Sequence, residues 1–273
     1  ELKPGDKLSL TFKAADRFAL DDFDVRSNPH AGTSDRVQLD VVTPDELLII
    51  LDRRELELRR RLEQIVDEMT QTRDALVRVK AELTGKMDEE SAAAPEDSLD
   101  RAIEGEEKQL TPEEKRERQL ALRRLRVQRA VNQSEKSRGE TEGVGLALLD
   151  MVEQIENNRV DTEDRKERLR GQVATPLLEL VASDFPELDK RLAALNKQVA
   201  AKELDAAAAG TAGEHALAQA DNVLLKLDAV LAKMLDLESF NELIELVRGL
   251  IDEQDNVLGE TKALRKRQLF GLE

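Results

Sequence analysis

Four acidic residues near the N-terminus are the first candidates for chemistry in this chain. They are Asp16, Asp21, Asp22 and Asp24. Carboxylate oxygens are ligands that calcium prefers, so the cluster could hold a calcium ion. Its spacing lacks the central glycine and the closing glutamate of an EF-hand loop. A calcium-sensing module is therefore one alternative, and a loop of solvated acids is the other.

Residues that commonly perform catalysis are sparse. The two histidines, His30 and His215, have no partner at metal-ligand spacing, and the chain contains no cysteine. Gly143-Val144-Gly145 resembles the start of a dinucleotide fingerprint, but the third glycine and a preceding strand are missing. Apart from the calcium alternative, we predict no catalytic, cofactor-binding or metal-binding residue and no enzymatic activity.

A polar, glycine-containing segment at residues 132–145 interrupts the apolar pattern of a predicted helix, between Val131 and Val144. Its candidate contact residues carry a hydroxyl group or no side chain: Ser134, Ser137, Gly139, Thr141 and Gly143. Each glycine lowers helix propensity by about 1 kcal/mol relative to alanine. Two interpretations stay open: a polar pocket or partner-contact site between helices, which could also bind a small ligand, and a solvated or kinked segment.

Long helices must position these residues. In the first predicted helix, seam residues recur at alternating three- and four-residue steps, which is the spacing of a coiled coil. They are Leu48, Leu51, Glu55, Leu58, Leu62, Ile65, Met69, Thr72, Leu76, Val79 and Leu83. Only Glu55 and Thr72 are not apolar. One helix cannot bury such a seam by itself, so we expect it to pack on the chain's own helices or on a protein partner.

Capping motifs locate the helix starts. Thr43 and Thr111 each begin a capping box with proline at the next position, and Thr211 and Ser239 begin similar boxes. Asp161-Thr162 and an acidic variant at Asp184 are further caps. Bends are expected at Pro176 and Pro186. The predicted helices cover residues 44–84, 112–159, 162–183, 184–204, 213–236 and 239–270.

The predicted chain has three parts. Residues 1–42 form a partial β-domain of two strands, in which Leu8, Leu10 and Phe12, then Val37, Leu39 and Val41, alternate with polar residues. Residues 43–204 form long coiled-coil helices with a mobile loop at 85–111. Residues 205–273 begin with a linker at 205–212 and form a C-terminal helical hairpin. The predicted fold is mainly α: an elongated antiparallel coiled-coil helical bundle with a small N-terminal β portion.

The charge pattern argues against a nucleic-acid partner. The net charge is −16, and aromatic residues, on which bases stack, make up only 2% of the chain. Two basic clusters, at residues 53–61 and 115–129, are interleaved with glutamates on heptad helices, so we expect them to pair across helix interfaces. The longest apolar run, residues 47–51, is far too short to span a membrane. The chain begins at Glu1 rather than Met, and we expect it to be a segment of a longer protein.

Several segments resemble the C-terminal region of large uncharacterised bacterial membrane-anchored envelope proteins. They are residues 41–48, 124–130, 157–162 and 233–243. The resemblance implies that residues 1–42 end an immunoglobulin-like sandwich and that any membrane anchor lies upstream. It implies a location in the cell envelope and a scaffold or tether function. We therefore expect a structural, protein-interaction module. A ligand- or calcium-sensing module and an oligomerisation element of a larger assembly are the alternatives.

Overall fold

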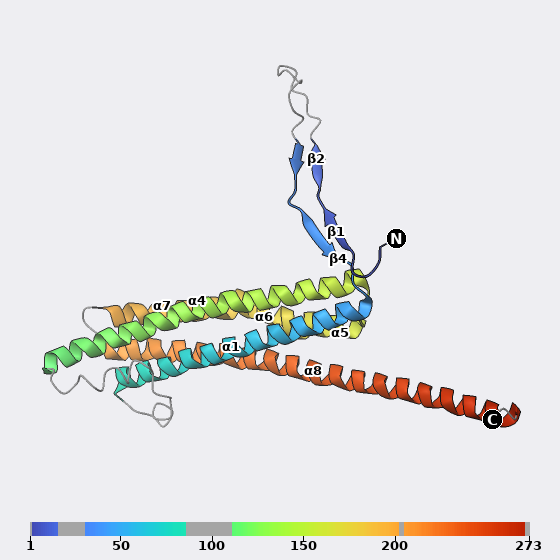
Figure 1. Ribbon diagram of the computed structural model, residues 1–273. Helices are drawn as coiled ribbons and strands as arrows, with labels where there is room; N and C mark the ends of the chain where they lie inside the picture. The colour runs from blue at the N-terminus through green and yellow to red at the C-terminus, as the bar shows by residue number, and fades with distance from the viewer. Residues whose placement is uncertain (1, 16–30, 86–110, 202–204, 271–273) are drawn as a thin grey trace, which may run out of the picture.

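The computed structural model describes residues 2–15, 31–85, 111–201 and 205–270. The described residues are mainly helical (84%), with a small β portion at the N-terminus. In Figure 1, the long helices lie side by side, a β-ribbon stands away from one end of them, and α8 continues past that end. The acidic cluster at Asp16–Asp24, His30 and nearly all of the loop predicted at 85–111 lie outside the described residues.

The first two long helices begin where the sequence predicts. α1 covers Pro44–Thr84 and α4 covers Pro112–Asn158. At both N-termini the capping box is complete: the threonine side chain accepts a hydrogen bond from the third residue's backbone, and that glutamate accepts one from the threonine backbone. α1 ends at Gly85 in the left-handed conformation (φ 64°), which glycine adopts without steric cost. These ends therefore follow from local sequence.

The chain returns as one helical path with two π-helical segments. The path comprises α5 (Glu163–Glu167), η2 (Arg168–Ala174), α6 (Thr175–Glu179), η3 (Leu180–Asp184) and α7 (Phe185–Ala200). Thr162 caps it as predicted, accepting from the Arg165 amide. Each π segment ends just before one of the prolines expected to bend the helix. Because proline lacks an amide proton and crowds the preceding turn, a local change of helix type accommodates each ring.

The predicted C-terminal hairpin is wrong. A single helix, α8, covers Ala206–Phe270 and includes the predicted linker and both predicted starts. Asp205 caps it, its carboxylate accepting from the amides of Ala207 and Ala208 at 3.1 Å. Alanine is the best helix former, so the alanine-rich linker becomes the first turns. Residues 236–239 contain no glycine or proline, so nothing stops the helix there.

Neighbouring helical segments run antiparallel. α1 contacts α4 and α8, and α7 contacts the same two helices from the other side. Arg54 near the start of α1 pairs with Asp150 near the end of α4, and Glu82 near the end of α1 pairs with Arg123 near the start of α4. These two helices are therefore antiparallel. We call α1, α4, the α5–α7 path and residues 206–234 of α8 the helical body, and residues 235–270 the overhang. Residues 2–15 and 31–40 and the overhang lie outside the body (Figure 1).

One apolar core runs through the helical body. The predicted α1 seam faces it: from Leu51 to Leu83 every seam position is buried except Leu58, which is half-buried, as is Leu48. Phe185 of α7 is the largest fully buried side chain. The sequence left two possibilities open for this seam, the chain's own helices or a protein partner, and in the described residues it lies in the chain's own core.

The described N-terminal residues form a two-stranded ribbon, as predicted, whose two sides are divided into four short strands. β1 (Lys7–Leu10) pairs antiparallel with β4 (Val37–Asp40), and β2 (Lys13–Ala15) pairs with β3 (Ala31–Thr33). The predicted alternation holds in the first ladder, where Leu8 faces Leu39 and Leu10 faces Val37. Each sheet has two strands. The described strands therefore form a ribbon, and its apolar side chains remain largely exposed.

Candidate functional site

The polar segment of α4 lies inside the helical body. Ser134, Ser137 and Thr141 are fully buried. With Val127, Ala130, Val144 and Leu148 they continue the three-four spacing. The predicted interruption of the seam is therefore wrong: buried positions follow one another through the segment. α4 runs through as one α-helix without a break. Hydroxyl groups take seam positions there in place of apolar side chains.

The buried hydroxyl groups bond within the chain. Ser134 donates to Asp189 Oδ1 of α7 at 2.8 Å. Thr141 donates to the Ser137 carbonyl one turn back at 2.7 Å, and Ser137 accepts from Gln133 at 3.2 Å. The Ser134 hydrogen bond joins α4 to α7, whereas those of Ser137 and Thr141 lie within α4, so all three buried hydroxyl groups are satisfied inside the chain. Contact between them and a separate partner would require the body to open.

Glu68 of α1 links this segment to the facing helix. It accepts from Lys136 Nζ at 2.8 and 2.9 Å and from Gln133 Nε2 at 2.5 Å. The hydrogen bond from Lys136 lowers the pKa of Glu68 most, and burial opposes it. Nearby, Glu140 pairs with Arg61 of α1, while its buried Oε2 has no hydrogen-bond partner among the described residues. Charges that flank the polar seam thus hold α4 against α1.

The glycines of the segment play different parts. Gly139 and Gly143 lie exposed, and a Cβ added at either would meet no described atom within 4 Å. At Gly145 the added Cβ would lie 3.0 Å from Leu178 Cδ2, so this glycine allows the α6 region to approach closely. The candidate contact residues Gly139 and Gly143 do lie in α4, but the glycine that packs closely against a neighbouring helix is Gly145, which was not among the candidates. Partner contact at Gly139 and Gly143 stays a prediction.

A buried ionic cluster joins the start of the return path to α1. The Arg165 guanidinium donates to Asp52 and Glu55 at 2.6 Å and to Asp161 at 2.8 Å. Burial alone would lower the pKa of Arg165, but the charges and hydrogen bonds of Glu55 and Asp52 raise it above its ordinary value. This cluster explains the glutamate at a seam position: Glu55 meets a cation instead of apolar side chains. Sequence spacing could not identify Arg165, which is 110 residues away.

Asp184, predicted as a helix cap, does something else. Its backbone is helical, and it makes no capping hydrogen bond. Its carboxylate accepts from Lys226 Nζ at 2.7 Å and from Asn222 at 2.8 Å, and its carbonyl accepts from Gln219 at 3.1 Å. Burial acts to raise the pKa of Asp184, but hydrogen bonds from Lys226, Ser183 and Asn222 together lower it. The residue therefore ties the second π segment to α8.

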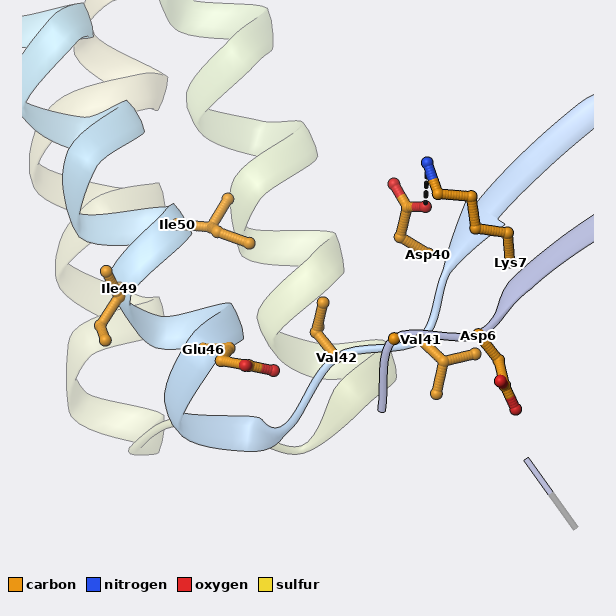
Figure 2. A pocket seen from close by; sticks show the side chains of 9 residues that line it. Asp6, Lys7, Asp40, Val41, Val42, Glu46, Ile49 and Ile50 are labelled. Carbon is orange, nitrogen blue, oxygen red and sulfur yellow. Dashed lines mark ion pairs between the residues drawn. The ribbon is translucent and has the colours of Figure 1, made fainter. Parts of the chain in front are cut away.

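A shallow pocket of about 520 Å³ lies where the ribbon joins α1. Figure 2 shows Ile49 and Ile50 in the first turns of α1, Val42 on the link, and the Lys7–Asp40 ion pair at the base of the ribbon. The two isoleucines are about half exposed. The polar groups at the joint already pair with one another, so the arrangement offers an apolar contact surface rather than a nucleophile beside a base.

The overhang exposes a second apolar surface. Among the side chains of α8 that the structure describes, Met234 is the last buried one. Leu235 is 43% exposed, and farther along five large apolar side chains are 47–61% exposed. They are Val247, Leu250, Ile251, Val257 and Leu258. We call these five residues the α8 stripe. The sequence also predicts a seam at three- and four-residue steps in this region, at Phe240, Leu243, Val247, Leu250, Gln254, Val257, Thr261 and Leu264. This predicted seam over residues 240–264 contains three residues of the α8 stripe, and the structure places no described helix against it.

Other binding chemistry is limited in the part of the chain that the structure describes. No group of three or more potential metal-ligating side chains comes together there. No helix there is both long enough and apolar enough to cross a lipid bilayer. The calcium alternative is not tested, because its aspartates lie outside the described residues. His215 is an exposed residue of α8.

No family model, curated protein sequence or solved structure matches this chain.

Proposed function

We propose that this chain is a structural, protein-interaction module. Its helical body would be an antiparallel coiled-coil bundle that acts as a rigid spacer or tether within a larger envelope-associated protein. The single observation that carries the proposal is the continuous packed seam. It passes from apolar layers through the buried hydroxyl groups of α4 without a break in the helix. A helical body closed in this way has little freedom to bend between its ends.

Ion pairs between helices support the same proposal. Arg54–Asp150, Lys136–Glu68 and Arg73–Asp221 tie α1 to its two neighbours at separate levels. Each exposed pair contributes little, about 0–1 kcal/mol. Pairs placed along the whole length nevertheless oppose sliding of one helix past the next. The buried Arg165 cluster closes the end next to the ribbon.

Rigidity is the property that tests a spacer. Because the chain has no cysteine, Glu57→Cys and His215→Cys provide two unique spin-label sites at exposed positions of α1 and α8. Gly213 lies against Lys80, so the two labels are separated by roughly 20 residues of helix, or about 30 Å along the axis. With unlabelled chain in excess, double electron–electron resonance spectroscopy should give one narrow distribution of distances between the two labels. A broad distribution would refute the spacer.

The proposed envelope location rests on the sequence resemblance. Attachment to a membrane would come through another part of the longer protein. Fractionation of cells that produce the full-length protein, with an antibody to this segment, tests the location. Recovery only in the soluble cytosolic fraction would exclude it.

The α8 stripe favours one second function, an oligomerisation element of a larger assembly. Exposed apolar residues at seam spacing are typical of a surface that another helix covers.

A further inference from the structure

We propose that the overhang of α8 pairs antiparallel with the overhang of a second copy of this chain. The inference deepens the proposed interaction function by naming the partner, and it rests on that function. It starts from the geometry of the α8 stripe. At 100° per residue its five residues fall within an arc of about 120°, the width of one helix-packing face.

The helical body of the same chain cannot cover this face. α8 continues as an unbroken helix through residue 270, so the overhang has no turn on which to fold back. Figure 1 shows it leading away from the other helices. A surface helix stabilises itself mainly by burying its apolar face, and an uncovered face leaves that contribution unused. None of the described helices covers this face, and a second copy of the chain can supply the covering helix.

The charge of the overhang indicates what that helix looks like. Residues 236–260 contain eight acidic residues and one arginine, whereas residues 261–270 contain four basic residues and no acid. A parallel pair would set the acidic stretch against the same stretch of its copy. An antiparallel pair brings the basic end of each overhang to the acidic beginning of the other. Opposite charges flanking a seam set partner choice and orientation, so the antiparallel pair is favoured.

One register satisfies both the seam and the charges. With residue 252 as the centre of symmetry, Val247 of each copy lies opposite Val257 of the other, and Leu250 lies opposite Gln254. The remaining predicted seam positions between 240 and 264 also fall into facing layers. Lys262 then lies opposite Glu242 of the other copy. A symmetric pair of this kind closes on itself, as isologous dimers do.

Sedimentation equilibrium of the whole chain from about 1 to 200 μM tests the pairing. The unaltered chain should form a dimer. The double variant Leu250→Glu/Val257→Glu should raise Kd by at least about 100-fold, since it sets charges in the seam. The matched control is Leu225→Glu, an exposed leucine of α8 within the helical body, 71% exposed. It should leave Kd within about threefold. A monomer at every concentration, or equal losses in both variants, would overturn the proposal.

Orientation is tested with one spin label per copy at Ala263→Cys, an exposed position. In the antiparallel register residue 263 lies opposite residue 241 of the other copy, so the two labels are about 33 Å apart along the axis. A parallel in-register pair would bring them within about 20 Å, and that result would overturn the antiparallel assignment. The distance between positions 57 and 215 of one chain is measured separately. Failure of the pairing and failure of the rigid spacer therefore give different results.

Discussion

The two halves of α8 have similar sequences and opposite surroundings. In residues 206–234, Ala216, Val223 and Leu227 are fully buried against α1 and α7. In the overhang, Val247, Leu250 and their neighbours repeat the same three-four spacing and remain exposed. The comparison teaches that a heptad pattern specifies a face that needs a partner, but not where the partner comes from. In the first half the chain supplies it, and in the second half we propose that a copy does.

The largest expected effect comes from the buried ionic cluster that closes the helical body. Arg165→Met should destabilise the chain by about 3–5 kcal/mol, because it leaves three carboxylates around a site without its cation. Arg170→Met is the matched control, since its pair with Glu156 is exposed. It should cost no more than about 1 kcal/mol. Urea unfolding followed by circular dichroism gives both values, and equal losses would contradict the role of the cluster.

The comparison of the two halves is tested directly by truncating one leucine in each. Leu227→Ala should cost about 2–5 kcal/mol, since it opens a cavity in the core. Leu250→Ala, at a position 61% exposed, should change the free energy of unfolding of the monomer by no more than about 0.5 kcal/mol. Both are measured by urea unfolding at a concentration at which the chain is monomeric. Similar losses would mean that the overhang packs on its own helical body.

Acid should loosen the contact between η3 and α8. The pKa of Asp184 is lowered in the folded chain, so its contribution to the free energy of unfolding is fully present above its ordinary pKa. It is lost as the pH falls through the lowered folded value. The stability difference between the unaltered chain and Asp184→Asn should therefore be largest near pH 7 and shrink below about pH 4.

Thermal unfolding at a series of pH values measures this difference. Lys226→Met removes the main partner and should reduce the same acid sensitivity. A difference that is constant from pH 7 to pH 3 would contradict the prediction.

The smallest expected effect distinguishes exposed from packed glycine in α4. Gly139→Ala should stabilise the chain by about 0.5–1 kcal/mol, because alanine favours the helix and meets no neighbour. Gly145→Ala gains the same helix preference but presses on Leu178. It should therefore be less stable than Gly139→Ala by about 1 kcal/mol or more. Urea midpoints show the order, and a reversed order would mean that α6 does not approach α4 closely.

Sequence reasoning succeeded where the cause is local and failed where it is not. The Thr43 and Thr111 caps place two helix starts to the residue, because each motif satisfies amide groups within one turn. The same motif at Thr211 lies inside α8, where the hydroxyl donates to the Ala207 carbonyl. An N-cap residue acts only at the first turn of a helix, and α8 already begins after Asp205, six residues before Thr211. Local patterns therefore propose helix starts, and neighbouring residues decide between them.

The candidate contact residues show the same division. Ser134, Ser137 and Thr141 look like a gap in a seam because each is polar. Only the packed chain shows that Asp189, Gln133 and the helix backbone satisfy them. No spacing rule connects Ser134 to a residue 55 positions away.

By itself, the sequence determined that the chain is mainly helical, that α1 and α4 begin at Pro44 and Pro112, and that the α1 seam faces a core. Hydrogen bonds within one turn and the period of the apolar residues depend only on residues near each other in the sequence, so the sequence alone predicts them. Only the tertiary structure decided that Glu55 meets Arg165, that Asp184 binds α8, and that α8 does not turn back. Those outcomes depend on which distant groups remain for a buried charge or an apolar face once the other helices have packed.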